Sequence, residues 1–274
     1  MSHQFSHQPT VSLTPEQIEA FHRDGFLSVP QISTPEEIEM MREAYDRIFA
    51  AQAGRDSGNQ FDLAGDDEDG KTQNLPQILN PEKYAPELWD VQARVNALHI
   101  VRQLFGDDMQ AGGGHAIFKP AKHGATTPWH QDEAYWNPDV EPRSISVWMP
   151  LQDVDESNGC MQFIPGSHKT EILPHQPIGN NPKVHGLELA PEANVDVSNP
   201  VICPLQAGGA TFHPSRTLHF TAANHSERPR RAFIMMFGAP AKTREELGLP
   251  PRRFEWLERQ QTNRLERMKN AAAK

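Results

Sequence analysis

Residues 144–164 read SISVWMPLQDVDESNGCMQFI, two apolar runs on either side of a polar, turn-forming stretch. Alternation of apolar and polar positions over about four to eight residues is typical of a half-buried strand, and Asn, Asp, Gly and Ser favour turns. The same pattern of short runs, separated by Gly, Pro, Asn and His, continues from about residue 110 to about residue 239. It predicts an all-β sandwich or barrel with strands at residues 115–119, 144–150, 161–164, 201–203, 210–213 and 231–238.

Helices are expected on either side of this β-rich region. Thr14 and Thr34 are each followed by Pro at the first helical position and by Gln or Glu three residues after the threonine, which is an N-cap pattern. We expect these two helices to pack on the outside of a sheet, with a short buried strand at residues 24–30 between them. A third helix is predicted at about residues 86–105 and a last one at about residues 251–270.

Two segments are predicted to lack regular structure. Residues 54–70, GRDSGNQFDLAGDDEDG, are rich in Gly, Asp and Asn and predict a mobile loop. Its acidic run is interpreted as a solvated surface, although long loops in compact domains also serve as lids over sites. Residues 1–12 are polar and predict a disordered N-terminal tail without a signal peptide.

Composition limits the partners of the chain. Its 274 residues carry a formal net charge of −10, whereas a nucleic-acid-binding surface would need an excess of basic residues. No apolar run reaches the roughly 18 to 20 residues of a membrane span. Cys160 and Cys203 are too few for a disulfide framework and predict a reducing, cytoplasmic location. No linker in the sequence separates a second folded unit.

Residues 128–136, PWHQDEAYW, contain the first candidate metal ligands. On a strand, His130 and Asp132 would point to the same face, which suits a metal ion but also a plain hydrogen-bonded pair. His219 lies 87 residues after Asp132, on what reads as a separate strand. Two histidines and one carboxylate can occupy one face of an octahedral Fe(II) and leave the other face open for O2 and a co-substrate.

Arg230 is a candidate for binding that co-substrate. It follows His219 by eleven positions, which is close to the reach of a next antiparallel strand. From there its guanidinium could form a bidentate ion pair with a carboxylate of a metal-bound molecule. The alternative is an ordinary surface charge, because Arg228 and Arg231 are close by in the sequence.

Three separated motifs carry a family resemblance. PWHQDEAYW (128–136), ISVWMPLQDVDESNGCMQFIPGSHK (145–169) and GGATFHPSRTLHFTAANHSERPRRAF (208–233) occur in the order and with the internal spacing of one family. Together they resemble the phytanoyl-CoA dioxygenase family of Fe(II)- and 2-oxoglutarate-dependent oxygenases. The resemblance implies one mainly β oxygenase domain over residues 1–274, a double-stranded β-helix (a cupin-like jelly roll) with flanking α-helices.

The resemblance also implies roles for individual residues. Iron would be held by His130, Asp132 and His219. Arg230 would bind the distal carboxylate of 2-oxoglutarate, and Thr221, at a position where serine is usual, would add a hydroxyl hydrogen bond. Further co-substrate positions fall on Trp148, Gln131, His115 and Lys71, and the substrate side on Tyr135 and Trp136.

The implied reaction is hydroxylation of an unactivated C–H bond of a small organic molecule, with release of succinate and CO2. It would use Fe(II), 2-oxoglutarate and O2, with ascorbate as reductant in vitro. A carboxylate at position 132 favours hydroxylation over halogenation, since related halogenases have a small residue there. A free small molecule is favoured over a coenzyme A ester. The alternatives are a zinc hydrolase with the same three ligands and a silent β-sandwich that binds a small molecule.

Overall fold

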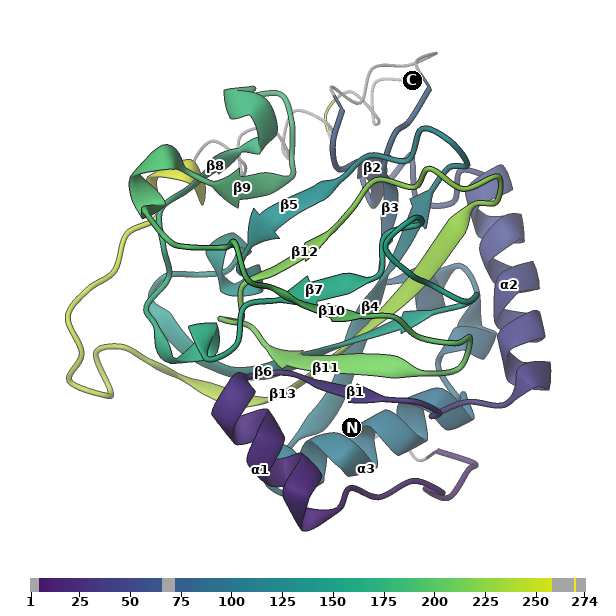
Figure 1. The fold of residues 1–274 in the computed structure, drawn as a ribbon, viewed down its shortest axis with the longest axis horizontal. Helices are drawn as coiled ribbons and strands as arrows, with labels where there is room; N and C mark the ends of the chain where they lie inside the picture. The colour runs from purple at the N-terminus through teal and green to yellow at the C-terminus, as the bar shows by residue number, and fades with distance from the viewer. Residues whose placement is uncertain (1–4, 66–71, 258–268, 270–274) are drawn as a thin grey trace.

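Two facing β-sheets form the body of the protein (Figure 1). The computed structural model describes residues 5–65, 72–257 and 269. Within them the large sheet has the strand order β1 (Leu27–Val29), β11 (Ala210–Pro214), β6 (Val140–Pro150), β13 (Arg230–Thr243), β4 (Gln110–Lys119), β3 (Pro76–Leu79) and β2 (Gln60–Asp62). The small sheet has the order β10 (Val201–Cys203), β7 (Met161–Phe163), β12 (His219–Thr221) and β5 (Thr127–His130). A separate pair is formed by β8 (His175–Pro177) and β9 (Leu187–Leu189). The predicted jelly roll and all six predicted strands of its core are confirmed.

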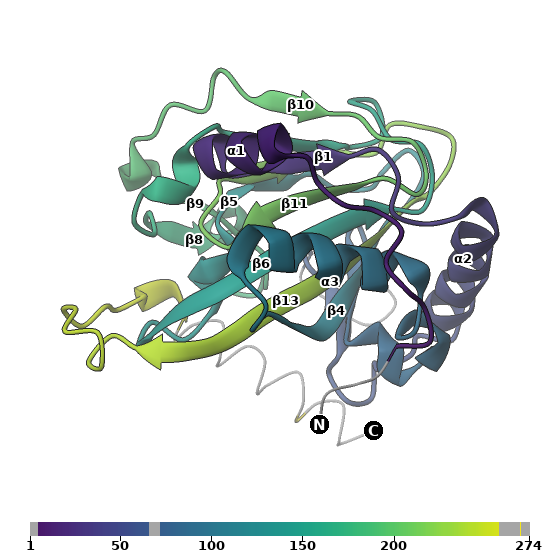
Figure 2. The ribbon, with the colours of Figure 1, turned by 90° about the horizontal axis from the view of Figure 1, so that it is seen from below.

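Three helices cover the outer face of the large sheet: α1 (Pro15–Asp24), α2 (Pro35–Ala50) and α3 (Gln92–Phe105). Figure 2 shows α1 and α3 in front of its strands. The predicted N-caps are confirmed, since the side chains of Thr14 and Thr34 each accept a hydrogen bond from a backbone N–H three residues on. The third helix begins later than predicted, because residues 86–88 form a separate 3-10 turn, η2 (Pro86–Leu88).

Alternation along the central strands separates the core from the site. On β6, Ile145, Val147 and Met149 belong to the apolar core under the helices. Ser146 and Trp148 point to the opposite face, between the two sheets, where they line a cavity. Because successive strand residues face opposite sides, one strand supplies both the core and the site. The same alternation on β13 directs Phe233 to the helices and Ile234 to the cavity.

The N-terminal tail was expected to be disordered; residues 5–12 form no helix or strand, but they make specific contacts with the rest of the chain. The backbone N–H and hydroxyl of Ser6 both donate to the Asp90 carboxylate, and the backbone N–H of Thr10 donates to the side-chain oxygen of Asn96. Phe5 also stacks on Trp89, with ring centroids 6.4 Å apart. The polar side chains of the segment find their partners in and just before α3, and no sequence pattern revealed that pairing.

The predicted 54–70 loop is wrong for residues 60–62, which form β2 at the edge of the large sheet. The buried Asp62 carboxylate accepts hydrogen bonds from the backbone N–H groups of Ala64, Asn74 and Leu75. It therefore holds the chain after β2 close to the chain just before β3. Residues 66–71, with the acidic run and Lys71, lie outside the described residues. Of the predicted C-terminal helix, residues 251–254 are not helical, residues 255–257 and 269 are helical, and residues 258–268 and 270 lie outside the described residues.

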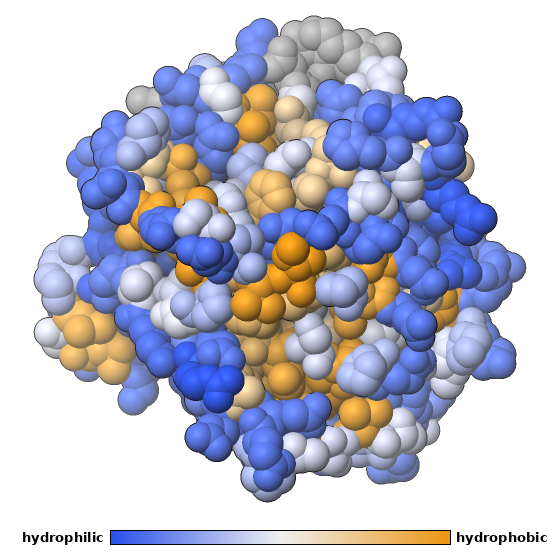
Figure 3. All heavy atoms as spheres, viewed as in Figure 1, coloured by the Kyte–Doolittle hydropathy of each residue, from blue (hydrophilic) through white to orange (hydrophobic). Residues whose placement is uncertain are grey.

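The face shown in Figure 3 is mostly polar around a central apolar area. Val201 and Ile202 of the edge strand β10 are 41% and 39% exposed and contribute to the apolar surface. Among the helices that the structure describes, none combines the length and apolar character needed to cross a bilayer.

Candidate metal centre and co-substrate pocket

Strand pairing brings the two candidate histidine ligands together. His219 of β12 is the cross-strand partner of His130 at the end of β5, and their ring centroids are 4.1 Å apart. Directly opposite residues of antiparallel strands have neighbouring side chains. Asp132 is not on β5, because the strand ends at His130 and Asp132 begins the 3-10 helix η3 (Asp132–Tyr135). The predicted two-residue strand alternation is therefore wrong, although the carboxylate still faces both rings.

Backbone carbonyls fix the orientation of both imidazoles. Nδ1 of His130 lies 2.8 Å from the Pro128 carbonyl oxygen, and Nδ1 of His219 lies 2.8 Å from the Thr217 carbonyl oxygen. A carbonyl oxygen only accepts, so each Nδ1 must carry the proton. The Nε2 lone pairs are thereby left for a metal ion. Histidines that bind metals in proteins usually donate their other ring N–H to a hydrogen-bond acceptor in the same way.

The two oxygens of Asp132 have different partners. Oδ1 lies 3.7 Å from Nε2 of His130 and 3.5 Å from Nε2 of His219. Oδ2 accepts a 2.6 Å hydrogen bond from the Ser146 hydroxyl and lies 3.5 Å from Nε2 of His213. Ser146 therefore turns the carboxylate so that one oxygen meets both imidazoles. Neither Ser146 nor His213 was predicted, because their contacts join three distant parts of the chain.

The three side chains fit a metal ion. One atom from each of His130, Asp132 and His219 lies within 4.8 Å of the others. Ligands about 2.1 Å from one ion are at most about 4.2 Å apart. The carboxylate–imidazole separations of 3.5 and 3.7 Å already lie within that limit. Two imidazoles and one carboxylate are also the donor set of non-haem Fe(II) oxygenases, in which one face of the metal stays open.

The protonation states suit metal binding as well. Burial lowers the pKa of His130 to about 3, and His219 adds to that effect, so the ring is neutral near pH 7. Burial raises the pKa of Asp132, but the neighbouring His219 and His213 outweigh it and hold the pKa well below its usual range. A neutral imidazole and an ionised carboxylate are the forms that bind a metal ion.

A cavity of about 380 Å³ opens between the sheets beside these three side chains. Arg230 lines it and is 1% exposed, and its Nε and Nη1 have no hydrogen-bond partner among the described residues. Burial lowers the pKa of Arg230 to about 9. A buried guanidinium without a partner is costly, so its position in a cavity favours binding of an anion there. The guanidinium also lies over the Trp148 ring, 5.4 Å from its centroid.

The route by which Arg230 reaches the cavity differs from the prediction. The next antiparallel neighbour of β12 was expected to carry it, but β12 belongs to the small sheet and β13 to the large one. Arg230 is the first residue of β13 and pairs in register with Lys119 of β4. It therefore faces the metal ligands across the space between the sheets.

The remaining predicted residues differ in their placement. The cavity is lined by Thr221, Trp148, His115, Tyr135 and Trp136. Gln131 does not line it, because its side chain contacts the backbone at Glu171, Leu173 and Arg216 instead. The side chain of Gln131 is thus turned away from the cavity, and its amide holds loops together. Lys71 lies outside the described residues.

A model of the family described as phytanoyl-CoA dioxygenase (PhyH) matches residues 21–232. The chain belongs to this family. That span contains β1 to β12 and the first strand residues of β13, and so all three candidate ligands and Arg230.

Relatives of this PhyH-family chain include solved and curated proteins. The structure of EvdO2 from Micromonospora carbonacea var. aurantiaca complexed with 2-oxoglutarate is 31% identical, with a TM-score of 0.75, and the match covers 92% of this chain and 99% of that one. A probable alpha-ketoglutarate-dependent hypophosphite dioxygenase of Stutzerimonas stutzeri is 24% identical over 82% of this chain and 78% of its own length. An ectoine dioxygenase of Nocardia farcinica is 25% identical over 83% and 78%, respectively.

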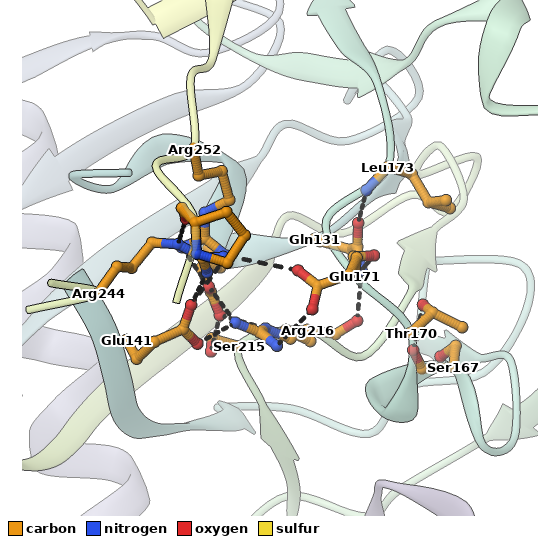
Figure 4. A network of polar contacts seen from close by, with 12 residues as sticks. Gln131, Glu141, Ser167, Thr170, Glu171, Leu173, Ser215, Arg216, Arg244 and Arg252 are labelled. Atoms are coloured by element: carbon orange, nitrogen blue, oxygen red, sulfur yellow. Dashed lines mark hydrogen bonds and ion pairs between the residues drawn. The ribbon is translucent and has the colours of Figure 1, made fainter. Parts of the chain in front are cut away.

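A buried charge network holds η3 of this PhyH-family protein in place. Glu133, next to Asp132, is 1% exposed and accepts hydrogen bonds from the Ser215 hydroxyl and from two nitrogens of Arg216. Arg252 forms a further ion pair with Glu133, at 2.9 Å. Figure 4 shows Arg216, Arg244 and Arg252 converging on Glu141 of β6 in the same network. The C-terminal segment is thereby tied to the turn that carries the candidate carboxylate ligand.

His175 supports the same turn from its other side. Its Nδ1 donates to the Leu173 carbonyl at 2.7 Å, so its Nε2 is free to accept the backbone N–H of Gln131 at 3.1 Å. Burial lowers the pKa of His175 to about 4, which keeps the ring neutral and able to accept. Trp256, whose indole N–H donates to the Ala134 carbonyl, packs beside this histidine. The backbone between the two ligands of the 130–132 motif is therefore fixed at several atoms.

Proposed function

We propose that this protein is a non-haem Fe(II)- and 2-oxoglutarate-dependent dioxygenase that hydroxylates an unactivated C–H bond of a small organic substrate. The observation that carries the proposal is the convergence of two imidazole Nε2 atoms and one carboxylate oxygen beside a cavity. The cavity also holds the buried guanidinium of Arg230, whose Nε and Nη1 have no hydrogen-bond partner among the described residues. Family membership and the 2-oxoglutarate complex of EvdO2 support it.

The proposed roles follow from the contacts. His130, Asp132 and His219 hold the iron, and Ser146 keeps Asp132 turned toward it. Arg230 and Thr221 bind the distal carboxylate of 2-oxoglutarate, while Trp148 walls the pocket beside the guanidinium. When bound, iron supplies the redox chemistry that uses O2 to convert 2-oxoglutarate to succinate and CO2 and to oxidise the substrate. The chain itself contributes orientation, charge and exclusion of water.

The substrate side of the cavity is assigned to Tyr135 and Trp136, with Leu63 and Leu79 completing an apolar wall. The Tyr135 hydroxyl accepts the backbone N–H of Leu187 at 2.7 Å, which holds the ring against the cavity. Among the described lining residues Arg230 is the one arginine or lysine, so a free small molecule is favoured over a coenzyme A ester with its phosphates. The Asp132 carboxylate favours hydroxylation over halogenation.

A substrate screen tests the proposed function. Purified protein with Fe(II), ascorbate and 2-oxoglutarate is incubated under O2 with small organic molecules, and succinate release is measured. The expected result is O2-dependent succinate formation that one class of molecule stimulates. Hydrolysis without O2 by zinc-loaded protein would instead identify a zinc hydrolase. Failure to bind 2-oxoglutarate in any metal-loaded form would indicate a silent binding module.

Replacement of Arg230 by methionine is expected to raise the KM for 2-oxoglutarate at least about 30-fold, because loss of one partner of a buried charge pair costs roughly 2 kcal/mol or more. Steady-state succinate formation at varied 2-oxoglutarate gives the KM. The matched control is Arg231→Met, since the neighbouring Arg231 pairs with the half-exposed Asp46 rather than lining the cavity. Equal KM values in the two variants would refute the role of Arg230.

The affinity for 2-oxoglutarate is expected to be constant below about pH 9 and to fall above it. Burial lowers the pKa of Arg230 to about 9 in the free protein, although the neighbouring Tyr45 and Cys160 act to raise it. A bound carboxylate stabilises the charged form and raises that pKa, so binding takes up a proton once the free guanidinium begins to titrate. Calorimetry at pH 7.5 and 9.5 measures the affinity for 2-oxoglutarate and the number of protons taken up on binding. An affinity that rises with pH would contradict the ion pair.

A further inference from the structure

Lys119 is a buried lysine directly behind the co-substrate end of the cavity. It is the last residue of β4 and is 0% exposed. Its Nζ lies 2.8 Å from the Thr221 hydroxyl oxygen, 3.2 Å from the Thr221 carbonyl oxygen and 2.5 Å from the Ala222 carbonyl oxygen. Burial lowers the pKa of Lys119 most, and the charge of Arg230 lowers it further. The three oxygen acceptors act in the opposite sense, because they match the three N–H groups of the ammonium form.

These contacts determine what the Thr221 hydroxyl can do. A hydroxyl that accepts a hydrogen bond from Lys119 must direct its own proton elsewhere. Thr221 lines the cavity whereas Lys119 does not, so the ammonium lies on the side of the oxygen away from the pocket. Among the described residues the hydroxyl of Thr221 has no acceptor for its proton. The remaining direction is into the cavity, where Arg230 lies in cross-strand register with Lys119.

We propose that Lys119 is a positioning residue for 2-oxoglutarate: its ammonium turns the Thr221 hydroxyl proton into the pocket, where it is donated to the distal carboxylate held by Arg230. This inference rests on the proposed function, because it assigns the bound anion as 2-oxoglutarate. A threonine hydroxyl is otherwise free to rotate, and a rotor that already points at its acceptor loses less entropy on binding.

The surroundings of Lys119 hold the ammonium where this role needs it. Gly159 has φ +87°, and a Cβ there would lie 2.4 Å from the Ala222 carbonyl oxygen and 3.6 Å from Nζ of Lys119. The turn therefore needs glycine to leave room for the contact. The Asn224 side-chain amide donates to the carbonyl of Lys119 at 3.1 Å and fixes the end of β4.

A purely structural role, in which Lys119 ties β4 to the end of β12 through the Thr221 and Ala222 carbonyls, makes a different prediction. Loss of the tie would act on the stability of the strands and not on the direction of one proton. Its effect on 2-oxoglutarate binding would then be the same whether or not residue 221 has a hydroxyl. A double-mutant cycle separates the two roles, because non-additivity reports coupling between the two side chains.

The cycle uses Lys119→Met, Thr221→Val and the double variant, with 2-oxoglutarate affinity measured by calorimetry on the anaerobic Fe(II) protein. Lys119→Met is expected to raise the Kd roughly tenfold in the protein that keeps Thr221. This is the size of effect expected when one hydrogen bond to a charged group, here from the Thr221 hydroxyl to the distal carboxylate, is lost. In the Thr221→Val protein the same change is expected to alter the Kd by less than about threefold. The control Lys122→Met, at an exposed residue of the following loop, should leave the Kd unchanged.

Each outcome is decisive. Equal fold-changes in the two backgrounds, or no change in either, overturn the role of Lys119. A wild-type protein that binds no 2-oxoglutarate would instead refute the proposed function, and that result is distinct. Should circular dichroism show that Lys119→Met does not fold, Lys119→Gln replaces it under the same criterion. Its two N–H groups can serve the two carbonyls and leave the hydroxyl without a donor.

Discussion

Replacement of Asp132 by asparagine is expected to lower Fe(II) affinity and succinate formation by at least about 100-fold. Outer partners of a metal ligand already contribute 10- to 100-fold to metal affinity, and a direct ligand contributes more. The amide also removes the negative charge that both imidazoles face at 3.5 and 3.7 Å. Titration of the anaerobic protein with Fe(II) gives the affinity, and coupled succinate assays give the rate.

His219→Ala should have an effect of the same order, because it removes one of the two histidine ligands. The matched controls are Asp139→Asn and His225→Ala, since both residues are exposed and neither lines the cavity. Both controls should bind Fe(II) and turn over like the wild type. Wild-type activity in either Asp132→Asn or His219→Ala would leave the proposed chemistry without its metal centre.

Replacement of Glu133 by alanine is expected to lower the free energy of unfolding by roughly 3–5 kcal/mol. Removal of one partner of a buried ion pair leaves the other charges uncompensated in a poorly solvated place. Here the carboxylate is 1% exposed, and its loss takes partners from both Arg216 and Arg252. Urea denaturation followed by tryptophan fluorescence measures the change.

Glu171 supplies the control for this experiment. It contacts the same two arginines at 3.9 Å, but its side chain is 73% exposed. Exposed ion pairs contribute little, so Glu171→Ala should change the unfolding free energy by less than about 1 kcal/mol. Because Glu133 anchors the turn next to Asp132, its replacement should also weaken Fe(II) binding. Equal stability of the two variants would show that burial adds nothing to the network.

The predictable part of the fold came from local patterns. N-caps at Thr14 and Thr34 and the alternation along β6 depend on residues a few positions apart, so they are visible in the sequence. The contacts of the N-terminal segment and the strand β2 were not predicted, because their partners are far away in the chain. Ser6 needs Asp90 and β2 needs β3, and a composition of Gly, Asp and Ser does not reveal either pairing.

The sequence by itself determined the family, the jelly roll and the set of side chains able to bind a metal, since those follow from residue types at fixed spacings. Only the tertiary structure decided their directions. The register of β12 on β5 put the two imidazoles side by side, and Ser146 of the other sheet turned the carboxylate toward them. Tertiary contacts also turned Gln131 away from the pocket and put Lys119 behind Thr221. The spacing of residues in the sequence determines which side chains lie on one face of a strand, whereas hydrogen bonds from distant strands determine where each atom points.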